Sequence, residues 1–203
     1  TEFVMELILA SASPRRRELL AQIGVAARVE PAEIDESLIE GEAAGDYVLR
    51  LAREKAQKIY DMQPPNRRVS TICLGSDTSV VFAGRVLGKP ANFAESQSML
   101  RQLSGTKHQV MTAVALVGAF GVREQLVTTD VWFRTLSDTE IETYWACGEP
   151  QDKAGSYGIQ GLGAVFVDHI EGSYSAVVGL PLAETSELLR TAGVPIWQPL
   201  KQD

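Results

Sequence analysis

Short apolar runs, separated by turns that contain glycine or proline, predict strands and helices along most of this chain. Residues 7–10 and 69–74 have the length and apolar character of short buried strands, and residues 108–117 and 124–136 predict two longer ones. Glycines within residues 118–121 predict a tight turn between the two long strands. We expect two further hairpins, over residues 79–87 and 164–178.

Apolar positions at helical spacing predict helices with recognisable first and last residues. Ser13 and Pro14 suit the N-cap and first position of a helix, and Gly24 suits its end. Two later helices begin with the capping-box pattern, formed by Asn92 with Glu95 and by Ser137 with Glu140. The remaining helices are expected over residues 46–60 and 181–192.

Strands and helices mix without strict alternation, which favours an α/β fold with a mixed central sheet flanked by helices. No break in composition and no internal repeat divides the 203 residues. We therefore expect residues 1–203 to form a single domain of two lobes with a cleft between them.

The chain has a formal net charge of −7, yet several of its cations lie beside glycine or proline. Binding of a nucleic-acid polymer requires a basic face, so this charge argues against such a partner. A local basic pocket in an acidic protein instead predicts a small anionic ligand. The cations in question are Arg15, Arg16, Arg17, Lys55, Lys89 and Lys153.

The longest apolar runs, such as residues 112–120, are too short and too often interrupted by glycine to predict a membrane span. The N-terminal residues lack the pattern of a signal peptide. Cys73 and Cys147 lie in apolar surroundings and do not have the spacing of a metal site. These features predict a cytoplasmic protein without a membrane partner.

A serine loop connects the first predicted strand to the first predicted helix, and arginines follow it directly. Ser11 and Ser13 contribute hydroxyls, and Arg15 and Arg16 place guanidinium groups in the first helical turn. Arginine is unfavourable there because this end of the helix dipole is already positive. Backbone N–H groups, hydroxyls and guanidinium groups together favour a phosphate site, and the alternative is a solvated basic turn.

Asp77 follows the predicted strand 69–74, so we expect it at the rim of the sheet, where open α/β folds bind ligands. Its carboxylate suits a metal ligand, a general base toward water, or a turn cap. Glu36 is a second candidate acid, for which the alternative is a solvated acidic loop. Lys55 lies on the apolar face of predicted helix 46–60, where its ammonium must reach solvent or meet an anion.

Residues 152–161 combine an ion pair, a phenol and an amide among several glycines. Glycine lets the backbone approach a ligand closely, and Gln160 can both donate to and accept from the edge of a base. We favour ligand contact for this segment over a purely structural glycine turn. Neither His108 nor His169 completes an arrangement for nucleophilic catalysis.

In their order along the chain, these motifs resemble the Maf family of nucleoside triphosphate pyrophosphatases. The resemblance extends from Leu7 to about Leu189, and it is specific because many individually weak motifs occur in sequence. The motifs are Ser11-Ala12-Ser13-Pro14-Arg15-Arg16, Arg53-Glu54-Lys55-Ala56, Gly75-Ser76-Asp77-Thr78, Gly88-Lys89-Pro90, Ser104-Gly105 with His108, Asp152-Lys153-Ala154-Gly155, Tyr157-Gly158-Ile159-Gln160-Gly161 and Val178-Gly179-Leu180-Pro181-Leu182.

The resemblance implies hydrolysis of a nucleoside triphosphate to the monophosphate and pyrophosphate, assisted by Mg²⁺ or Mn²⁺, in the deep cleft of a two-lobed α/β fold. It implies that Asp77 accepts a proton and that Arg15, Thr78 and Gln160 select the base. Thr78 and Gln160 are similar to the branch that acts on dTTP and UTP. Ala176 departs from the asparagine that many members carry, which weakens any role for that position.

The other candidate residues are assigned to the phosphates and the cation, because a triphosphate carries several negative charges to be neutralised. The expected catalytic residues are Asp77, Glu36, Lys55 and Lys89, and the expected metal ligands are Asp77 and Glu36. The expected substrate-binding residues are Ser11, Ser13, Arg15, Arg16, Thr78, Lys153 and Gln160.

Two alternatives to a dTTP/UTP pyrophosphatase remain. One is a pyrophosphatase for other or modified nucleotides, such as 7-methyl-GTP. The other is a nucleotide-binding regulator of cell division without turnover, which the presence of Asp77, Lys55 and Lys89 disfavours. In each case the expected partner is a small-molecule nucleotide, and a homodimer is compatible with the sequence.

Overall fold

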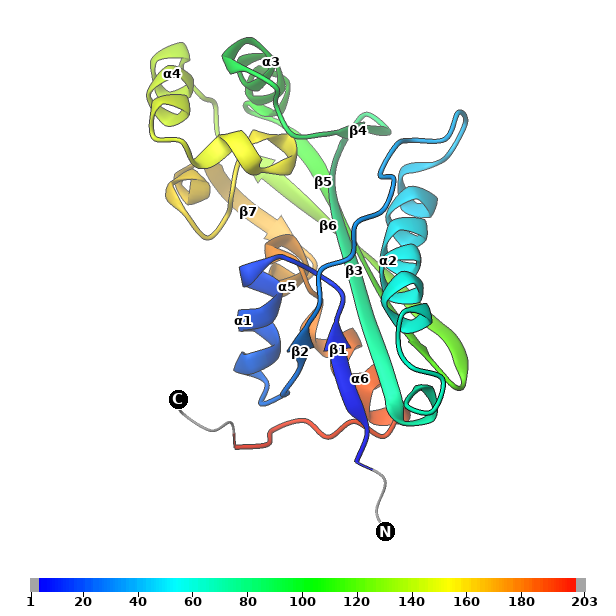
Figure 1. The fold of residues 1–203 in the computed structure, drawn as a ribbon. Coiled ribbons are helices and arrows are strands. Elements are labelled where there is room, and N and C mark those ends of the chain that lie inside the picture. Colours follow the sequence, from blue (N-terminus) through cyan, green and yellow to red (C-terminus); the bar gives the residue numbers. More distant parts are fainter. Residues whose placement is uncertain (1–3, 200–203) are drawn as a thin grey trace. The chain divides into compact units, whose positions relative to one another are not determined.

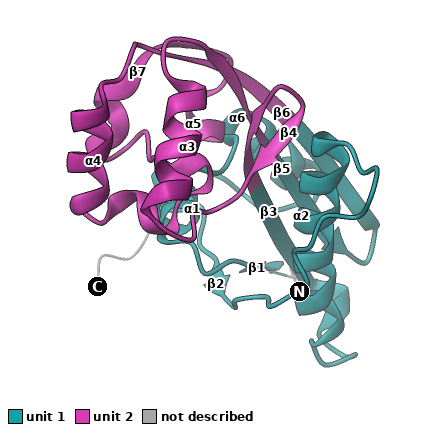
Figure 2. Cartoon of the chain, turned by 90° about the horizontal axis from the view of Figure 1, so that it is seen from above, with its two compact units in different colours: residues 1–77, 112–126, 179–203 teal, residues 78–111, 127–178 magenta. Residues whose placement is uncertain are grey.

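A computed structural model describes residues 4–199 of the chain, which divides into two compact units. Unit 1 contains residues 1–77, 112–126 and 179–203, and unit 2 contains residues 78–111 and 127–178 (Figure 2). Each unit therefore combines segments that are distant in the sequence.

Unit 1 is built on parallel strands. β1 (Glu6–Leu9) pairs in parallel with β2 (Arg28–Val29) and with the first part of β3 (Thr71–Phe82), so that Ile8 lies opposite Cys73 (Figure 1). The helical elements of this unit are α1 (Pro14–Gln22), α2 (Ala44–Asp61), the 3₁₀ turn η1 (Arg68–Ser70) and α6 (Leu182–Thr191).

The apolar stripe of α2 packs on one face of β3, where Ala56 and Ile59 meet Cys73. The two elements approach closely at Gly75, because a Cβ atom there would lie 2.1 Å from the carbonyl oxygen of Ala52. Side chains alternate between the faces of a strand, so Asp77 projects from the same face as Cys73 and Gly75. The packing of α2 thus determines what surrounds Asp77.

Unit 2 contains two antiparallel pairings. The end of β3 forms a hairpin with β4 (Arg85–Leu87), and β6 pairs antiparallel with β7 (Val167–Glu171). Its helices are α3 (Phe93–Leu103), α4 (Asp138–Ala146), α5 (Tyr174–Val178) and the 3₁₀ turns η2 (Glu149–Asp152), η3 (Ala154–Ser156) and η4 (Leu162–Phe166). A core that includes Leu100, Phe133, Ile141 and Tyr157 holds these elements together.

Three long strands, β3, β5 (Lys107–Gly118) and β6 (Gly121–Phe133), contribute residues to both units. The order of hydrogen-bonded strands is β2-β1-β3-β5-β6-β7, with β4 attached to β3. Parallel and antiparallel pairs occur in this one sheet, which confirms the predicted mixed α/β fold.

The local signals for helix starts are largely confirmed. Ser13 caps α1, and Ser137 and Glu140 form a complete capping box at α4. At α3 the pattern is only half realised: Asn92 accepts a hydrogen bond from the backbone of Glu95, whose carboxylate accepts from Ala91 N instead. The predicted helices 46–60 and 181–192, the hairpin 79–87 and the two long strands are also present.

Two predictions were wrong. The strand expected over 69–74 continues to Phe82, so Asp77 lies within β3 rather than at its end. This continuation is stabilised by pairing of Val80 with Leu87 and by burial of its small and apolar side chains. The second strand of the hairpin expected over 164–178 is the helix α5, because Ser173 accepts a hydrogen bond from Ala176 N and caps the turn.

No helix among residues 4–199 combines the length and the apolar character needed to cross a membrane.

Candidate active site

Asp77 and Lys55 form a buried ion pair in unit 1. Asp77 projects from β3 toward α2, and its Oδ1 lies 3.0 Å from the Nζ of Lys55. Each side chain is only 12% exposed. Lys55 therefore does not extend to solvent from the apolar face of α2. Its ammonium meets an anion, and that anion is a carboxylate of the chain itself.

Glu36 completes a three-residue charge cluster, which we call the Asp77 cluster: Asp77, Lys55 and Glu36. The Oε1 of Glu36 also lies 3.0 Å from Lys55 Nζ, although the Glu36 side chain is 53% exposed. One ammonium thus lies between two carboxylates. The alternative interpretation, in which Glu36 is only a solvated acid in an acidic loop, is therefore wrong.

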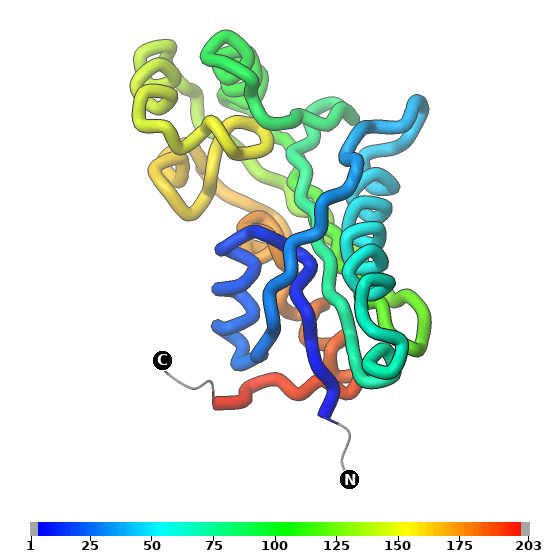
Figure 3. The backbone as a smooth tube through the Cα atoms, in the orientation of Figure 1, coloured from blue at the N-terminus to red at the C-terminus, as the bar shows by residue number. Residues whose placement is uncertain are grey.

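The loop that carries Glu36 runs between β2 and α2 and has no regular structure (Figure 3). Side chains of α2 hold it in place. The Tyr47 hydroxyl donates a hydrogen bond of 2.7 Å to the Glu36 carbonyl, and Arg50 donates to the Ser37 carbonyl at 3.0 Å. Arg50 also binds both carboxylate oxygens of Glu42, at 2.6 and 2.9 Å. The position of Glu36 therefore depends on α2.

The environment of Asp77 changes its protonation equilibrium. Burial raises the pKa of Asp77 above the usual aspartate value, while the charges of Lys55 and Arg16 and the hydrogen bond from Lys55 partly oppose this rise. A carboxylate with a raised pKa is a stronger base than an ordinary aspartate, yet its cationic neighbours favour the ionised form. Asp77 is accordingly suited to accept a proton from water.

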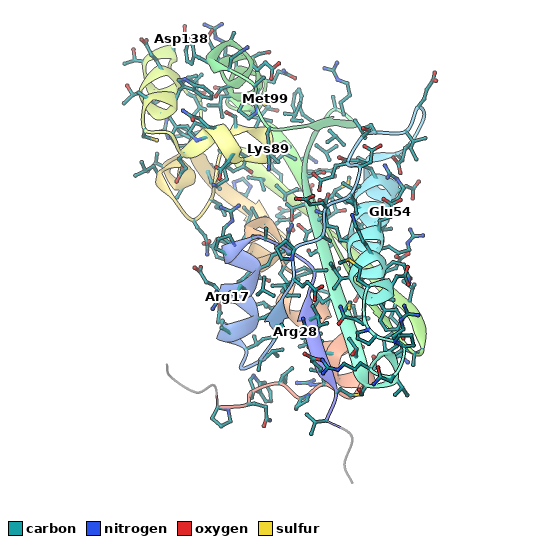
Figure 4. The ribbon with its side chains drawn as sticks, viewed as in Figure 1. Arg17, Arg28, Glu54, Lys89, Met99 and Asp138 are labelled. Atoms are coloured by element: carbon teal, nitrogen blue, oxygen red, sulfur yellow. The ribbon has the colours of Figure 1, made fainter. Side chains whose placement is uncertain are left out.

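The serine loop before α1 has a well-defined internal structure. Ser11 Oγ accepts hydrogen bonds from Ser13 N at 3.1 Å and from the Arg16 guanidinium at 3.4 Å, and Ser13 Oγ accepts from Arg16 N at 3.4 Å. The hydroxyls that were predicted to bind phosphate therefore also cap the helix and orient Arg16. Arg15 follows in the first turn of α1, and Figure 4 labels Arg17 on the same helix.

Arg16 is further fixed by the carbonyl oxygen of Gly179, which accepts from its Nε at 2.8 Å. Ser76 Oγ lies 3.1 Å from the same oxygen and 2.8 Å from Ala113 O, so its single hydroxyl proton is shared between the two carbonyls. Gly179 has a φ of +144°, a conformation that favours glycine, and thereby turns its carbonyl toward both donors. Ser76 and Gly179 are positioning residues that residue-level reasoning missed, although both lie in motifs that carry the resemblance.

Asp77 and Glu36 are the residues of the Asp77 cluster that could hold a divalent cation, because carboxylate oxygens are the ligands that Mg²⁺ takes. Asp77 Oδ1 and Glu36 Oε1 each lie 3.0 Å from one positive atom, Lys55 Nζ. Within residues 4–199, no group of three or more His, Cys, Asp and Glu side chains could hold a metal ion. A two-carboxylate set suits Mg²⁺, which usually keeps several waters and binds one or two carboxylates together with substrate phosphates.

The other candidate residues belong to unit 2. Thr78 follows Asp77 on β3 and therefore projects from the opposite face of the strand. Lys89 lies exposed between β4 and α3, where Figure 4 labels it, and Lys153 pairs with Asp152 at 2.8 Å. Gln160 lies exposed in an irregular turn between η3 and η4. The predicted loop over residues 152–163 is thus a series of short turns.

Other positioning residues were missed because their sequence signals are ordinary. Tyr47 and Arg50 read as polar positions of an amphipathic helix, and Tyr144 reads as an apolar position of α4. Glu149, which holds the turn around Gln160, reads as a charged loop residue. Only their contacts distinguish these residues from their neighbours.

The chain is similar to known proteins over nearly its whole length. The dTTP/UTP pyrophosphatase of Colwellia psychrerythraea is 58% identical over 193 residues, covering 95% of this chain and 91% of that protein. Proteins of the same name from Hahella chejuensis and Vibrio vulnificus are 51% and 56% identical, and they cover 94% and 91% of this chain and 94% and 97% of their own length.

A solved structure of a nucleoside-triphosphatase (dITP/XTP pyrophosphatase) from Mycobacterium abscessus aligns with 94% of this chain and 98% of its own. Its sequence identity is 16% and its TM-score 0.43, a similarity too weak to indicate a shared fold. The sequence model of the Maf-like proteins, by contrast, matches residues 6–192, nearly the whole chain. With relatives that are 51–58% identical over almost their full length, this match shows that the chain belongs to the Maf-like protein family.

Proposed function

We propose that this chain hydrolyses dTTP and UTP to the monophosphate and pyrophosphate, with a divalent cation and with Asp77 as general base. The observation that carries the proposal is the buried Asp77 carboxylate, whose Oδ1 lies 3.0 Å from Lys55 Nζ. The substrate class is supported by the relatives that are 51–58% identical and named dTTP/UTP pyrophosphatases.

In the proposed reaction, a water oxygen forms a bond to the α-phosphorus, and the bond from that phosphorus to the oxygen bridging toward the β-phosphate breaks. Pyrophosphate leaves with the electron pair of the broken bond, and Asp77 accepts a proton from the attacking water. General-base assistance of this kind contributes typically ~10²–10⁴-fold in rate. Burial favours the basicity of Asp77, while Lys55 keeps it ionised before the proton arrives.

The remaining charge chemistry is electrostatic positioning. A divalent cation bound by Asp77 and Glu36 would neutralise phosphate charge and favour departure of pyrophosphate. We assign Lys55, Lys89 and Lys153 to phosphate oxygens, together with the arginines of the first turn of α1. Ser11 and Ser13 support this set by orienting Arg16 and capping α1.

Base selection is assigned to Gln160, Thr78 and Arg15. Uracil and thymine present two carbonyl acceptors on either side of an N3–H donor, a pattern that an amide meets with its own donor and acceptor. The exposed position of the Gln160 side chain is compatible with this contact.

The test is release of pyrophosphate from dTTP, UTP, CTP, GTP and 7-methyl-GTP, each measured with Mg²⁺ and with Mn²⁺. We expect kcat/KM to be highest for dTTP and UTP. We also expect the release of pyrophosphate to stop when the cation is chelated. A preference for 7-methyl-GTP would place the chain in the other branch of the family. Nucleotide binding without release of pyrophosphate would support a regulator instead.

A further inference from the structure

A single carboxylate holds the turn on which Gln160 lies. Glu149, at the start of η2, accepts a hydrogen bond from Leu162 N at Oε1, 2.8 Å away, and from Gly163 N at Oε2, 2.9 Å away. Backbone N–H groups on the C-terminal side of Gln160 are therefore bound to a side chain from a preceding element. Residues 157–161 belong to no helix or strand, and the 3₁₀ turn η4 begins only at Leu162.

Tyr144 binds the backbone on the N-terminal side of Gln160. Its hydroxyl donates a hydrogen bond to Glu149 Oε2 and accepts one from Gly158 N at 3.2 Å. Tyr144 is itself only 6% exposed, and its ring packs edge-on against Phe166, with centroids 4.9 Å apart. The turn from Gly158 to Gly163 is thus attached at both ends to one pair of hydrogen-bonded side chains.

The glycines of the turn leave room for this pair. A Cβ atom on Gly161 would lie 1.5 Å from Glu149 Oε1, and one on Gly163 would lie 2.7 Å from the Tyr144 hydroxyl. Any larger residue at position 161 would therefore displace the carboxylate. The glycine that follows Gln160 thus has a definite steric cause, which is the close approach of Glu149.

The protonation states support the direction of these hydrogen bonds. Burial opposes ionisation of Glu149, but its hydrogen bonds and the charge of Lys153 outweigh burial and lower its pKa below the usual glutamate value. Burial and the hydrogen bond to Glu149 raise the pKa of Tyr144, so its hydroxyl keeps its proton and donates it. The pair is an ionised acceptor beside a neutral donor.

We propose that Glu149 and Tyr144 are specificity-determining positioning residues, which set base selectivity by fixing the turn that presents Gln160. The inference rests on the proposed function, in which Gln160 reads the pyrimidine edge. Neither residue needs to touch the substrate. An exposed amide discriminates between bases only if its donor and acceptor are held in one orientation, and here the backbone on both sides of it is fixed by this pair.

Glu149→Gln is the primary variant. The amide has one acceptor oxygen where the carboxylate has two, and its NH₂ group would face a backbone N–H or the Tyr144 hydroxyl. The turn loses part of the hydrogen bonding from Leu162 N and Gly163 N, while the volume of the side chain at position 149 is conserved. Glu142→Gln is the matched control, because Glu142 is an exposed glutamate two residues before Tyr144 on α4.

The measurement is the ratio of kcat/KM for UTP to that for GTP. We expect this ratio to fall at least about tenfold in Glu149→Gln, since a displacement of about 1 Å of a positioned group has effects of this size and larger. The loss should appear mainly in KM for UTP, with kcat nearly unchanged. Glu142→Gln should match the native chain. A purely structural role would instead lower the activity on both nucleotides equally.

Tyr144→Phe is the second variant and keeps the test decisive if Glu149→Gln fails to fold. It removes the hydroxyl that joins Glu149 to Gly158 and retains the ring against Phe166. We expect a smaller fall of the same ratio, and faster hydrogen exchange at the amides of Gly158, Leu162 and Gly163.

The outcomes separate the inference from the function on which it rests. A native chain that hydrolyses GTP as well as UTP contradicts both. A native preference for UTP that survives unchanged in both variants overturns the positioning role alone.

Discussion

The Asp77 cluster in unit 1 and the Gln160 turn in unit 2 carry the two halves of the proposed function in opposite ways. Asp77 lies on a regular strand, is buried, and meets a charged side chain directly. Gln160 lies exposed in an irregular turn, and side chains hold the backbone around it. Burial is what changes the pKa of a general base, whereas a reader of base edges needs a fixed orientation and access to the ligand.

The largest effect is expected from Asp77→Asn, which removes the base without opening a cavity. We predict a fall in kcat of at least ~10²-fold, the low end for a lost general base, with nucleotide binding retained. Asp46→Asn, at an exposed position in the first turn of α2, serves as the control. Near-native turnover by Asp77→Asn would reject Asp77 as base and as essential metal ligand.

The same variant tests the electrostatics of burial through its stability. The pKa of Asp77 is raised in the folded chain, so the folded state binds a proton at this carboxylate more tightly than the unfolded state does. This part of the stability is present at low pH and is lost as pH rises from the unfolded to the folded pKa. At neutral pH, Asp77→Asn should therefore unfold at a temperature no lower than the native chain, as thermal melts will measure.

Lys55→Met is expected to have the next largest effect and to change the pH profile. Lys55 lowers the pKa of Asp77, so its removal should raise that pKa further and move the acid limb of kcat to higher pH. Activity at neutral pH should fall about 10- to 150-fold, the equivalent of a charge-assisted hydrogen bond of ~1.5–3 kcal/mol.

Lys89→Met, in unit 2, sharpens the contrast between the two lysines. Its side chain is exposed in the turn after β4, and we expect it to contact phosphate. KM for the triphosphate should rise while the acid limb stays in place. If both lysine variants bind and turn over substrate normally, the assignment of these residues to phosphate fails.

Gln160→Glu should change selectivity more than turnover. The substitution replaces the amide donor with a second acceptor that faces the base carbonyls. A polar group left unpaired once the bound base covers it costs ~1–3 kcal/mol, or roughly ten- to a hundredfold. The measurement is kcat/KM for dTTP, UTP, CTP, GTP and 7-methyl-GTP. An unchanged profile in the variant, or a native preference for a purine, would contradict the base-reading role.

The smallest effect is expected from Tyr47→Phe, which removes only the hydrogen bond to the Glu36 carbonyl. A hydrogen bond contributes ~0.5–1.5 kcal/mol net, so kcat should fall about two- to tenfold through loss of order in the Glu36 loop. Tyr60→Phe is the matched control on the same helix, since its hydroxyl donates to Arg68 O, 3.2 Å away. Equal effects of the two variants would show that Tyr47 acts on stability alone.

Sequence signals worked where the causes are local. Ser13 and Pro14 predicted the start of α1, and Ser137 with Glu140 predicted the start of α4, because a cap depends on residues within one turn. The apolar stripe of α2 was equally readable and correctly placed Lys55 on its buried side. The order of motifs along the chain was enough to indicate the family.

Only the tertiary structure decided what those residues meet. Asp77 and Lys55 are 22 positions apart in the sequence, and no local pattern shows that their side chains are in contact. Strand pairing extended β3 past Asp77, although the local pattern had predicted that the strand ends before it. A serine cap made residues 174–178 helical, although their local pattern had predicted a strand. Glu149 binds Leu162, 13 positions away, and Ser76 binds Gly179, 103 positions away. Such contacts form only when the chain folds, because burial and hydrogen bonding depend on which segments pack together and not on composition along the chain.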